Sequence, residues 1–394
     1  MFLATENAMD QLRYLNIRVT MKIPVIDLFA GAGGIGIAVH QCNGDLRLSV
    51  EIDDKCCETL RANPAFHTGE IVHSDVSLLT GEQLRDIAGL KSQDPLVIVG
   101  GPPCQPFSKA SYWTDPGHDS RYRQARANGE SLPKPSQITE AKADERRTLV
   151  QVFLDRVIDT KADGFLFENV KSILHPRNKV VVDDFISRAE SMGYKTTLVV
   201  ANAAEYGVPQ KRERVFILGS KYEKPVEPTK THNKTTDHKD GRLPVVTVGE
   251  ALKGLDTDVF FEPEEVVSGK WEKEFKEIPE GKNYKALTEW AGHPNPVFVA
   301  ETKFWTFLLK LSPSIPSWTI AASPGPWTGP FHWNNRRLRT SEMAALQTFP
   351  RDYKFIGSRR VRVKQIGNAA PPLLVKKMLE SVFASVSNGC QKVS

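Results

Sequence analysis

A cysteine stands among prolines and glycines in a stretch whose residue types suit a nucleophile. Residues 100–108 read GGPPCQPFS and follow the apolar run PLVIV, so Cys104 comes directly after a strand-like segment. Prolines fix φ and reduce loop entropy, so the thiol is presented at a defined place. A free cysteine is more often a buried, inert packing residue. Because the flanking Gly and Pro argue against burial within a helix or sheet, the pattern favours Cys104 as a nucleophile.

Two further segments carry charged side chains at or next to apolar runs. Glu168 stands near the end of GFLFENV, where a carboxyl group partly removed from water can deliver a proton. A loop or helix-capping glutamate is the plainer alternative.

In GVPQKRERVFILG, the residues Gln210, Arg212 and Arg214 alternate and would share one face of a strand. Aligned guanidinium groups bind carboxylates, phosphates or a carbonyl oxygen, whereas exposed strand arginines would bind nothing specific.

The first glycine-rich segment matches a cofactor-binding pattern. VIDLFAGAGGIGIAVHQ places Gly31, Gly33 and Gly36 at G-x-G-x-x-G spacing, and Glu51 ends the next apolar run. The glycines allow close approach of a ligand, and the acid can accept ribose hydroxyls. NAD and S-adenosylmethionine share these requirements, so the segment alone indicates an adenosine-type cofactor. Asp75, in the third run, suits an adenine amino group and a helix N-cap equally well.

These residues lie at the ends of alternating strand-like and helical segments. We expect strands in IPVIDLF, LRLSVEI, EIVHSDV, PLVIVGG, GFLFENV, KTTLVVANA and RERVFILGS, with helices between most of them. This alternation predicts an α/β fold with a mostly parallel sheet and helices on both faces. Open sheets of this kind bind ligands at the carboxyl ends of their strands, which is where Cys104 and the glycine-rich loop fall.

Two segments depart from the alternation. Residues 109–147 are polar and rich in Arg, Lys, Gly and Pro, and they are too long for a routine connection. Between about 225 and 335 prolines multiply and six of the seven tryptophans occur, which indicates a separate, irregular lobe. QIGNAAPPLLVKKMLESVFASV becomes helical after its prolines and would pack back on the first lobe.

Composition and charge restrict the class of protein. The 394 residues are 40% hydrophobic and 25% charged, which is ordinary for a globular protein, and suit two lobes. No signal peptide or membrane-spanning run is visible. The five cysteines lack metal-ligand spacing, and their odd number argues against a disulfide framework.

Residues 336–364 hold nine Lys/Arg against two acids in a chain of net charge +5, which suits a phosphate backbone or a solvated basic face.

Six motifs in one order resemble those of the DNA (cytosine-5)-methyltransferase family of the bacterial restriction–modification type. The resemblance covers nearly the whole chain outside residues 1–20, 109–147 and 250–315. DLFAGAGG is similar to the family's cofactor loop, GGPPCQPFS to its nucleophile loop and FENV to its acid motif. QKRERVFILG is similar to the arginine strand, RRLRTSEMAALQTFP to the motif after target recognition, and QIGNAAPP to the last cofactor-side motif.

The resemblance implies a Rossmann-like class I methyltransferase sheet with helices on both faces, plus a smaller irregular target-recognition domain. We expect a catalytic domain over 21–240, with 355–394 packing back onto it. The target-recognition domain would span 241–354, and residues 1–20 would be an N-terminal extension.

The resemblance also implies the chemistry. Cys104 would add to carbon 6 of a flipped-out cytosine, and Glu168 would contact N3 and the exocyclic amine. Arg212 and Arg214 would hold the base carbonyl, Glu168 and backbone phosphate. Carbon 5 would take a methyl group from S-adenosyl-L-methionine, and loss of its proton with β-elimination would release Cys104. No metal is implied.

Further contacts carry over motif by motif. Phe29 and Ile52 would cover the two faces of the adenine, Glu51 would take the ribose hydroxyls, and Asp75 the adenine amine. The implied cofactor-binding set is Phe29, Ala30, Gly31, Gly33, Glu51, Ile52, Asp75, Pro103 and Asn368. The implied DNA contacts are Gln105, Ser108, Gln210, Arg336, Arg337 and Arg339.

The expected partner is double-stranded DNA, with functional pairing to a restriction endonuclease. We expect a monomer in the bacterial cytoplasm, associated with the nucleoid and not with a membrane. A tRNA methyltransferase of the same family is the nearest alternative, because the catalytic motifs do not separate the two. A nicotinamide oxidoreductase would explain the glycine pattern alone. A catalytically inactive DNA-binding protein is disfavoured because no catalytic position is lost.

Overall fold

A seven-stranded sheet forms the centre of the molecule. The computed structural model describes residues 22–107, 121–122, 124–126, 128–134, 144–233 and 241–393. The sheet order is β3-β2-β1-β4-β5-β8-β6. The first five strands in this order, β3, β2, β1, β4 and β5, are mutually parallel. β8 is antiparallel to both of its neighbours, β5 and β6. The expected mostly parallel sheet is therefore confirmed. The strands are β1 Pro24–Leu28, β2 Asp45–Glu51, β3 Glu70–His73, β4 Val97–Gly100, β5 Gly164–Val170, β6 Lys195–Asn202 and β8 Glu213–Ser220.

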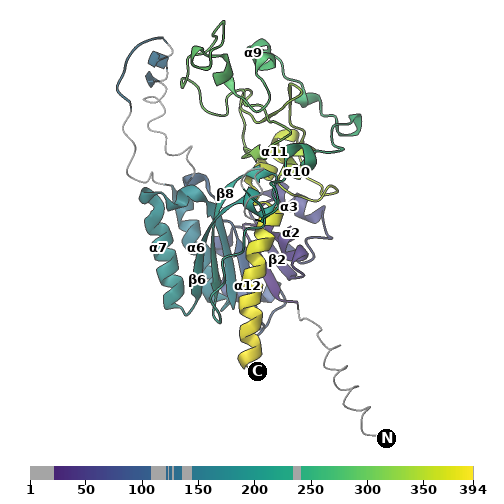
Figure 1. Ribbon diagram of the computed structural model, residues 1–394. Coiled ribbons are helices and arrows are strands. Elements are labelled where there is room, and N and C mark those ends of the chain that lie inside the picture. The colour runs from purple at the N-terminus through teal and green to yellow at the C-terminus, as the bar shows by residue number, and fades with distance from the viewer. Residues whose placement is uncertain are drawn as a thin grey trace.

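Helices cover both faces of this sheet, as the alternation predicts. Successive strand residues point to opposite faces, so Ile26 packs towards one helical layer and Val25 towards the other. One layer contains α4 (Gly81–Ile87), α6 (Leu149–Asp159) and α7 (Pro176–Ser191). The other contains α2 (Gly34–Gln41) and α12 (Pro372–Val393), which Figure 1 shows running along the sheet. The last described helix thus packs beside the first.

The second part of the molecule is irregular and lies beyond one end of the sheet (Figure 1). It has its own small apolar core, which includes Phe275, Tyr284 and Phe331. The domain limits given above remain a prediction. The short elements of this region and the helices that connect it to the sheet are α8 Val248–Ala251, α9 Glu272–Glu277, β9 Ser317–Trp318, β10 Phe331–His332, β11 Arg336–Arg337, α10 Thr340–Leu346 and α11 Arg359–Asn368.

The predicted arginine strand is interrupted. Residues Gln210–Lys211 form a separate short strand, β7, which pairs in parallel with β9 of the second part. β8 begins only at Glu213, so Arg212 lies between two different sheets. The prediction that Gln210, Arg212 and Arg214 share one face of a single strand is therefore wrong.

None of the helices in the described ranges is both long enough and apolar enough to cross a membrane.

Candidate active site

A cavity of about 290 Å³ opens at the carboxyl edge of the sheet. Its wall is built by the segments that follow β1 to β4, by the end of β5 and by one face of α11. Of the nineteen predicted catalytic, cofactor and DNA residues, twelve line the cavity. Those that do so are Phe29, Ala30, Gly31, Glu51, Ile52, Asp75, Pro103, Cys104, Gln105, Glu168, Arg214 and Asn368.

The glycine-rich loop turns sharply between β1 and α2. Phe29, Gly31 and Gly33 all have positive φ, at 58°, 53° and 83°. A Cβ on Gly33 would lie 2.4 Å from the His67 ring and 2.6 Å from the Tyr353 hydroxyl, so only glycine fits there. Gly33 does not line the cavity. Its expected contact with a cofactor is thus replaced, in this geometry, by packing against the protein interior.

His67 and Tyr353 support this loop from behind. The Tyr353 hydroxyl donates to the carbonyl oxygen of Ala32 at 2.8 Å, and His67 Nε2 lies 2.8 Å from the same hydroxyl. Since the tyrosine proton goes to Ala32, the histidine donates from Nε2. Burial lowers the pKa of His67 to about 4, so the ring is neutral at pH 7. Neither residue was predicted, because they contact the loop from segments distant in sequence.

Glu51 ties the loop to the end of β2. One carboxylate oxygen accepts from the Gly31 amide at 2.7 Å, and the other accepts from the amides of Ile52 and Asp53 at 2.9 and 2.8 Å. Burial raises the pKa of Glu51. A carboxylate offers about four acceptor positions, so capacity remains for a ligand hydroxyl. Ile52 itself is 63% exposed at the lip of the cavity.

Two acids at the cavity also cap helices. Asp75 accepts from the amide and hydroxyl of Ser77, both at 2.8 Å, and so caps a short 3-10 helix while lying on the cavity wall. Asp53 caps α3 (Asp54–Arg61) and lies 3.0 Å from Lys364 Nζ of α11. This ion pair links two lining segments, and sequence reasoning did not identify it.

Cys104 lies in a constrained loop after β4. Asn169 Nδ2 donates to the carbonyl of Pro102 at 3.2 Å, and the Phe107 amide donates to the carbonyl of Cys104 at 3.0 Å. The cysteine is half-buried. Burial raises the pKa of its thiol, and the guanidinium of Arg214 acts in the opposite direction. At neutral pH the resting thiol is therefore protonated.

Glu168 and Arg214 form an ion pair across neighbouring strands. Arg214 Nε lies 2.7 Å from Glu168 Oε1, and both side chains are about nine-tenths buried. A Cβ on Gly101 would lie 2.9 Å from the other Glu168 oxygen, so the loop that carries Cys104 approaches the carboxylate closely because it starts with glycine. The structure thus brings the predicted acid, its arginine and the cysteine loop to one cavity.

Arg212 has a different environment. It is fully buried and donates to the carbonyls of Gly367 and Ala369 at 2.8 and 3.1 Å, and to that of Ile320 at 3.4 Å. It does not line the cavity. Its guanidinium already joins two distant backbone segments, at Ile320 and at Gly367–Ala369, so the geometry does not support the expected contact of Arg212 with a base or phosphate.

Three of the predicted DNA contacts are also buried and already paired. Gln210 bonds to Gln347 Oε1 and to two backbone groups. Arg336 Nη2 lies 2.7 Å from Glu342 Oε1, and Arg339 is paired with another buried acid. These three side chains hold protein segments together, so the geometry does not support them as contacts to DNA.

The other predicted DNA contacts differ from one another. Gln105 is exposed on the cavity wall beside Cys104. Arg337 is half-buried and lies over the Phe331 ring at 5.6 Å. Ser108 lies outside the described residues. No group of three or more His, Cys, Asp or Glu in the described ranges is arranged to hold a metal ion.

Comparison with known proteins gives consistent matches along the chain. The model of the C-5 cytosine-specific DNA methylase family matches residues 23–384. Type II methyltransferase M.SacI of Streptomyces achromogenes is 34% identical over 393 residues, covering 92% of this chain and 93% of its own. Type II methyltransferase M.NgoFVII of Neisseria gonorrhoeae is 29% identical over 381 residues, covering 94% and 89%.

A solved structure gives the same result for the fold. The crystal structure of a Spodoptera frugiperda DNMT2 mutant has a TM-score of 0.58 and 16% identity. The similarity covers 92% of this chain and 100% of that chain. The expected Rossmann-like methyltransferase fold is therefore confirmed.

Proposed function

Because this chain belongs to the C-5 cytosine-specific DNA methylase family and is a DNA (cytosine-5)-methyltransferase, we propose that it acts through a covalent bond between Cys104 and the cytosine. The methyl donor in this proposal is S-adenosylmethionine, and the substrate is a cytosine within a duplex DNA sequence. One observation carries the proposal. A single cavity holds Cys104, the paired Glu168 and Arg214, and the loop Phe29–Gly31.

The residues around the loop fit S-adenosylmethionine. A Cβ built on Gly31 meets nothing closer than a backbone oxygen at 4.0 Å, so the backbone is open to close approach of a ligand. Phe29 and Ile52 would hold the adenine ring, Glu51 the ribose hydroxyls and Asn368 the methionine end. Asp75, Ala30 and Pro103 complete the proposed set. When bound, this cofactor supplies an electrophilic methyl group.

Cys104 and Glu168 divide the work on the base. The sulfur of Cys104 forms a bond to carbon 6 while the proton that it loses reaches N3 through Glu168, which makes carbon 5 nucleophilic. Carbon 5 takes the methyl group and then gives its proton to water. N3 returns its proton to Glu168, the double bond between carbons 5 and 6 forms again, and the carbon–sulfur bond breaks to release Cys104. Arg214 keeps the Glu168 carboxyl group in place through the 2.7 Å ion pair. Since the resting thiol is protonated, we expect addition only when the base is bound against Glu168.

The cytosine must leave the duplex to reach this site. Cys104 lies inside a cavity, and carbon 6 of a base that stays stacked and paired in the duplex is not open to attack from there. Enzymes that do chemistry on a base flip it out of the stack into such a pocket. We also propose that methylation protects DNA in the bacterial cytoplasm from a partner restriction endonuclease.

Cys104→Ser tests the proposed route. The variant should bind duplex DNA and S-adenosylmethionine as the wild type does but lose nearly all transfer of a labelled methyl group. Duplex with 5-fluorocytosine at the target should form a stable adduct with the wild type and none with the variant, because fluorine cannot leave as a proton does. A variant with near wild-type activity would sink the covalent route.

The substrate is tested separately. Labelled methyl transfer to DNA and to tRNA should favour DNA, and plasmid from an expressing host should resist a cognate endonuclease. Transfer to tRNA alone would overturn the DNA assignment. Tight binding of NADH without binding of S-adenosylmethionine would overturn the cofactor.

A further inference from the structure

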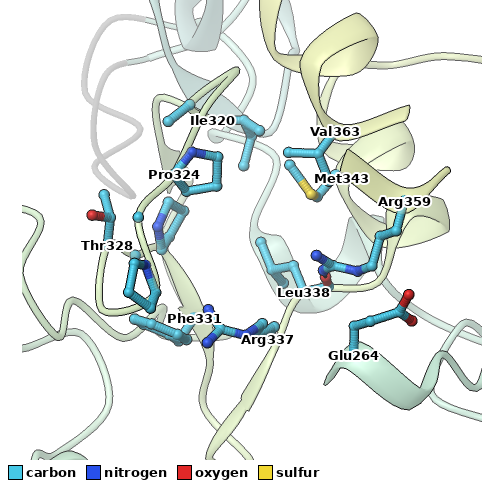
Figure 2. Close-up of a pocket in the computed structure, with 15 residues that line it drawn as sticks. Glu264, Ile320, Pro324, Thr328, Phe331, Arg337, Leu338, Met343, Arg359 and Val363 are labelled. Carbon is cyan, nitrogen blue, oxygen red and sulfur yellow. The ribbon is translucent and has the colours of Figure 1, made fainter. Parts of the chain in front are cut away.

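A second cavity lies on the other side of α11 from the active site. It has a volume of about 240 Å³ and is enclosed by the loop 320–330 and by α10 and α11 (Figure 2). Its wall is mostly apolar, with charged groups gathered on one side: Arg337, Arg359 and, at the exposed rim, Glu264. The apolar part is formed by Ile320, Pro324, Pro326, Pro330, Phe331, Leu338, Met343 and Val363.

Arg337 differs from four neighbouring arginines in having no carboxylate partner among the described residues. Arg336, Arg339, Arg359 and Arg362 each lie within 4.0 Å of a carboxylate. Within the described ranges, Arg337 forms no ion pair, and its guanidinium lies over the Phe331 ring. Burial lowers the pKa of Arg337, and the charge of Arg359 lowers it further. Arg359 already has Glu262 as its countercharge, so Arg337 is the half-buried cation that an anion would stabilise.

The cavity combines the guanidinium of Arg337 with an apolar wall. A phosphodiester supplies the anion, and the deoxyribose attached to it is a compact, largely apolar ring that suits a wall of prolines. Planar guanidinium groups are well matched to phosphate oxygens. Given the function proposed above, on which this step rests, we propose that the cavity binds one phosphodiester of the DNA backbone through Arg337, with the neighbouring deoxyribose against Pro324, Pro326 and Pro330.

This contact would be coupled to the active site through two connections. The carbonyl of Ile320 accepts from Arg212 at 3.4 Å, and the Ile320 amide donates to Gln210 at 3.1 Å. α11 supplies Val363 to this cavity and Asn368 to the catalytic one. A phosphate held by Arg337 is therefore at a fixed position relative to Cys104. Arg337 thus acts as a positioning residue that sets how the duplex lies before the cytosine is flipped.

The salt dependence of DNA binding tests this assignment. A short, fluorescently labelled duplex of mixed sequence is titrated with the full-length protein at several NaCl concentrations, because phosphate contacts are independent of sequence. Arg337→Gln should weaken binding about tenfold and reduce the slope of log K against log [NaCl] by about 0.9, which corresponds to one lost phosphate contact. Arg337→Gln should weaken binding by the same factor when the duplex contains the sequence that the enzyme methylates.

Two further variants control for charge and folding. Arg188→Gln on α7 makes the same charge change at an exposed ion pair with Asp155, and it should leave the slope unchanged. Glu264→Gln removes a negative charge from the rim and should strengthen binding about twofold, as expected for one exposed charge interaction.

The outcomes separate this proposal from the function on which it rests. A slope for Arg337→Gln equal to that of Arg188→Gln overturns the phosphate site, even if the wild type methylates DNA. Weakening limited to the methylated site would mean that Arg337 reads a base, and would also overturn it. If Arg337→Gln does not fold, the test passes to Glu264→Gln, and an unchanged affinity of that variant rejects the site. A wild type that does not methylate DNA would instead reject the proposed function.

Discussion

The thiol of Cys104 lies in a loop where burial raises its pKa and Arg214 lowers it. Burial is the larger effect, so the free enzyme holds a thiol and not a thiolate at neutral pH. An unreactive resting thiol is protected from oxidation and from alkylation. Reactivity of the thiol would then depend on binding of the base. The bound base would contact Glu168 and offer N3 as an acceptor for the thiol proton.

Alkylation of the resting enzyme measures this directly. The rate of reaction of Cys104 with iodoacetamide should rise with pH and should not level off below about pH 8.5, the ordinary range of a thiol. Burial raises the pKa of Cys42 to about 12, so that residue should add little background. Peptide mapping against Cys104→Ser identifies the labelled site. A plateau of the rate below neutral pH would show a thiolate in the resting enzyme.

The meeting of Cys104 and Glu168 at one cavity could be predicted, because each stands within a short motif of distinctive residues. The surroundings of Arg212 and Arg336 could not. Whether an arginine faces a cavity or a buried acid depends on segments distant in sequence, such as that of Gly367 for Arg212. Residue type therefore predicted which side chains gather at the cavity, but not which cations were already paired.

At the scale of elements, the loop between β1 and α2 depends on a partner from another part of the chain. Tyr353, in the segment between α10 and α11, donates to Ala32 and fills the space left by Gly33. The cofactor loop is therefore shaped by the same segment that follows the irregular lobe. The local order of strands and helices was predictable from apolar periodicity, whereas β7 was not, because it pairs with β9 more than a hundred residues later.

Tyr353→Phe should weaken cofactor binding while leaving the chemical step intact. Loss of one hydrogen bond of about 1 kcal/mol corresponds to a rise of about fivefold in the Kd of S-adenosylmethionine. Calorimetric titration measures the Kd, and kcat at saturating cofactor should stay near that of the wild type. Tyr206→Phe is the matched control, because its hydroxyl donates to the Pro228 carbonyl outside the cavity. An equal Kd in both variants would contradict support of the loop by Tyr353.

At the scale of the whole molecule, buried charges join the irregular lobe to the helices beside the sheet. Glu342 of α10 is fully buried and accepts from Arg336 at 2.7 and 2.8 Å and from the Arg339 amide at 2.9 Å. Arg336 also pairs with Asp256, near the start of the lobe. Both ends of the lobe thus meet at one arginine, Arg336. Sequence composition indicated a basic segment here, but its pairing with acids of the lobe required the fold.

Glu342→Gln should destabilise the protein strongly. The substitution leaves Arg336 buried without its main countercharge, which costs about 3–5 kcal/mol. Urea denaturation should show a clearly lower midpoint. Glu380→Gln, at an exposed pair with Lys377, should cost less than about 1 kcal/mol. Equal midpoints for the two variants would show that the buried acid does not hold the lobe in place.

The cavity at the sheet edge also has a consequence for biosynthesis. Its walls come from near both ends of the described chain, Gly31 on one side and Asn368 on the other. A ribosome completes the Cys104 loop long before it makes α11 and α12, so the emerging polypeptide has Cys104 before it has the second wall of the cavity. Contacts between such distant segments form slowly. Methylating capacity should therefore arise only after translation of the last helices, and a chain that stalls earlier would leave DNA unmodified.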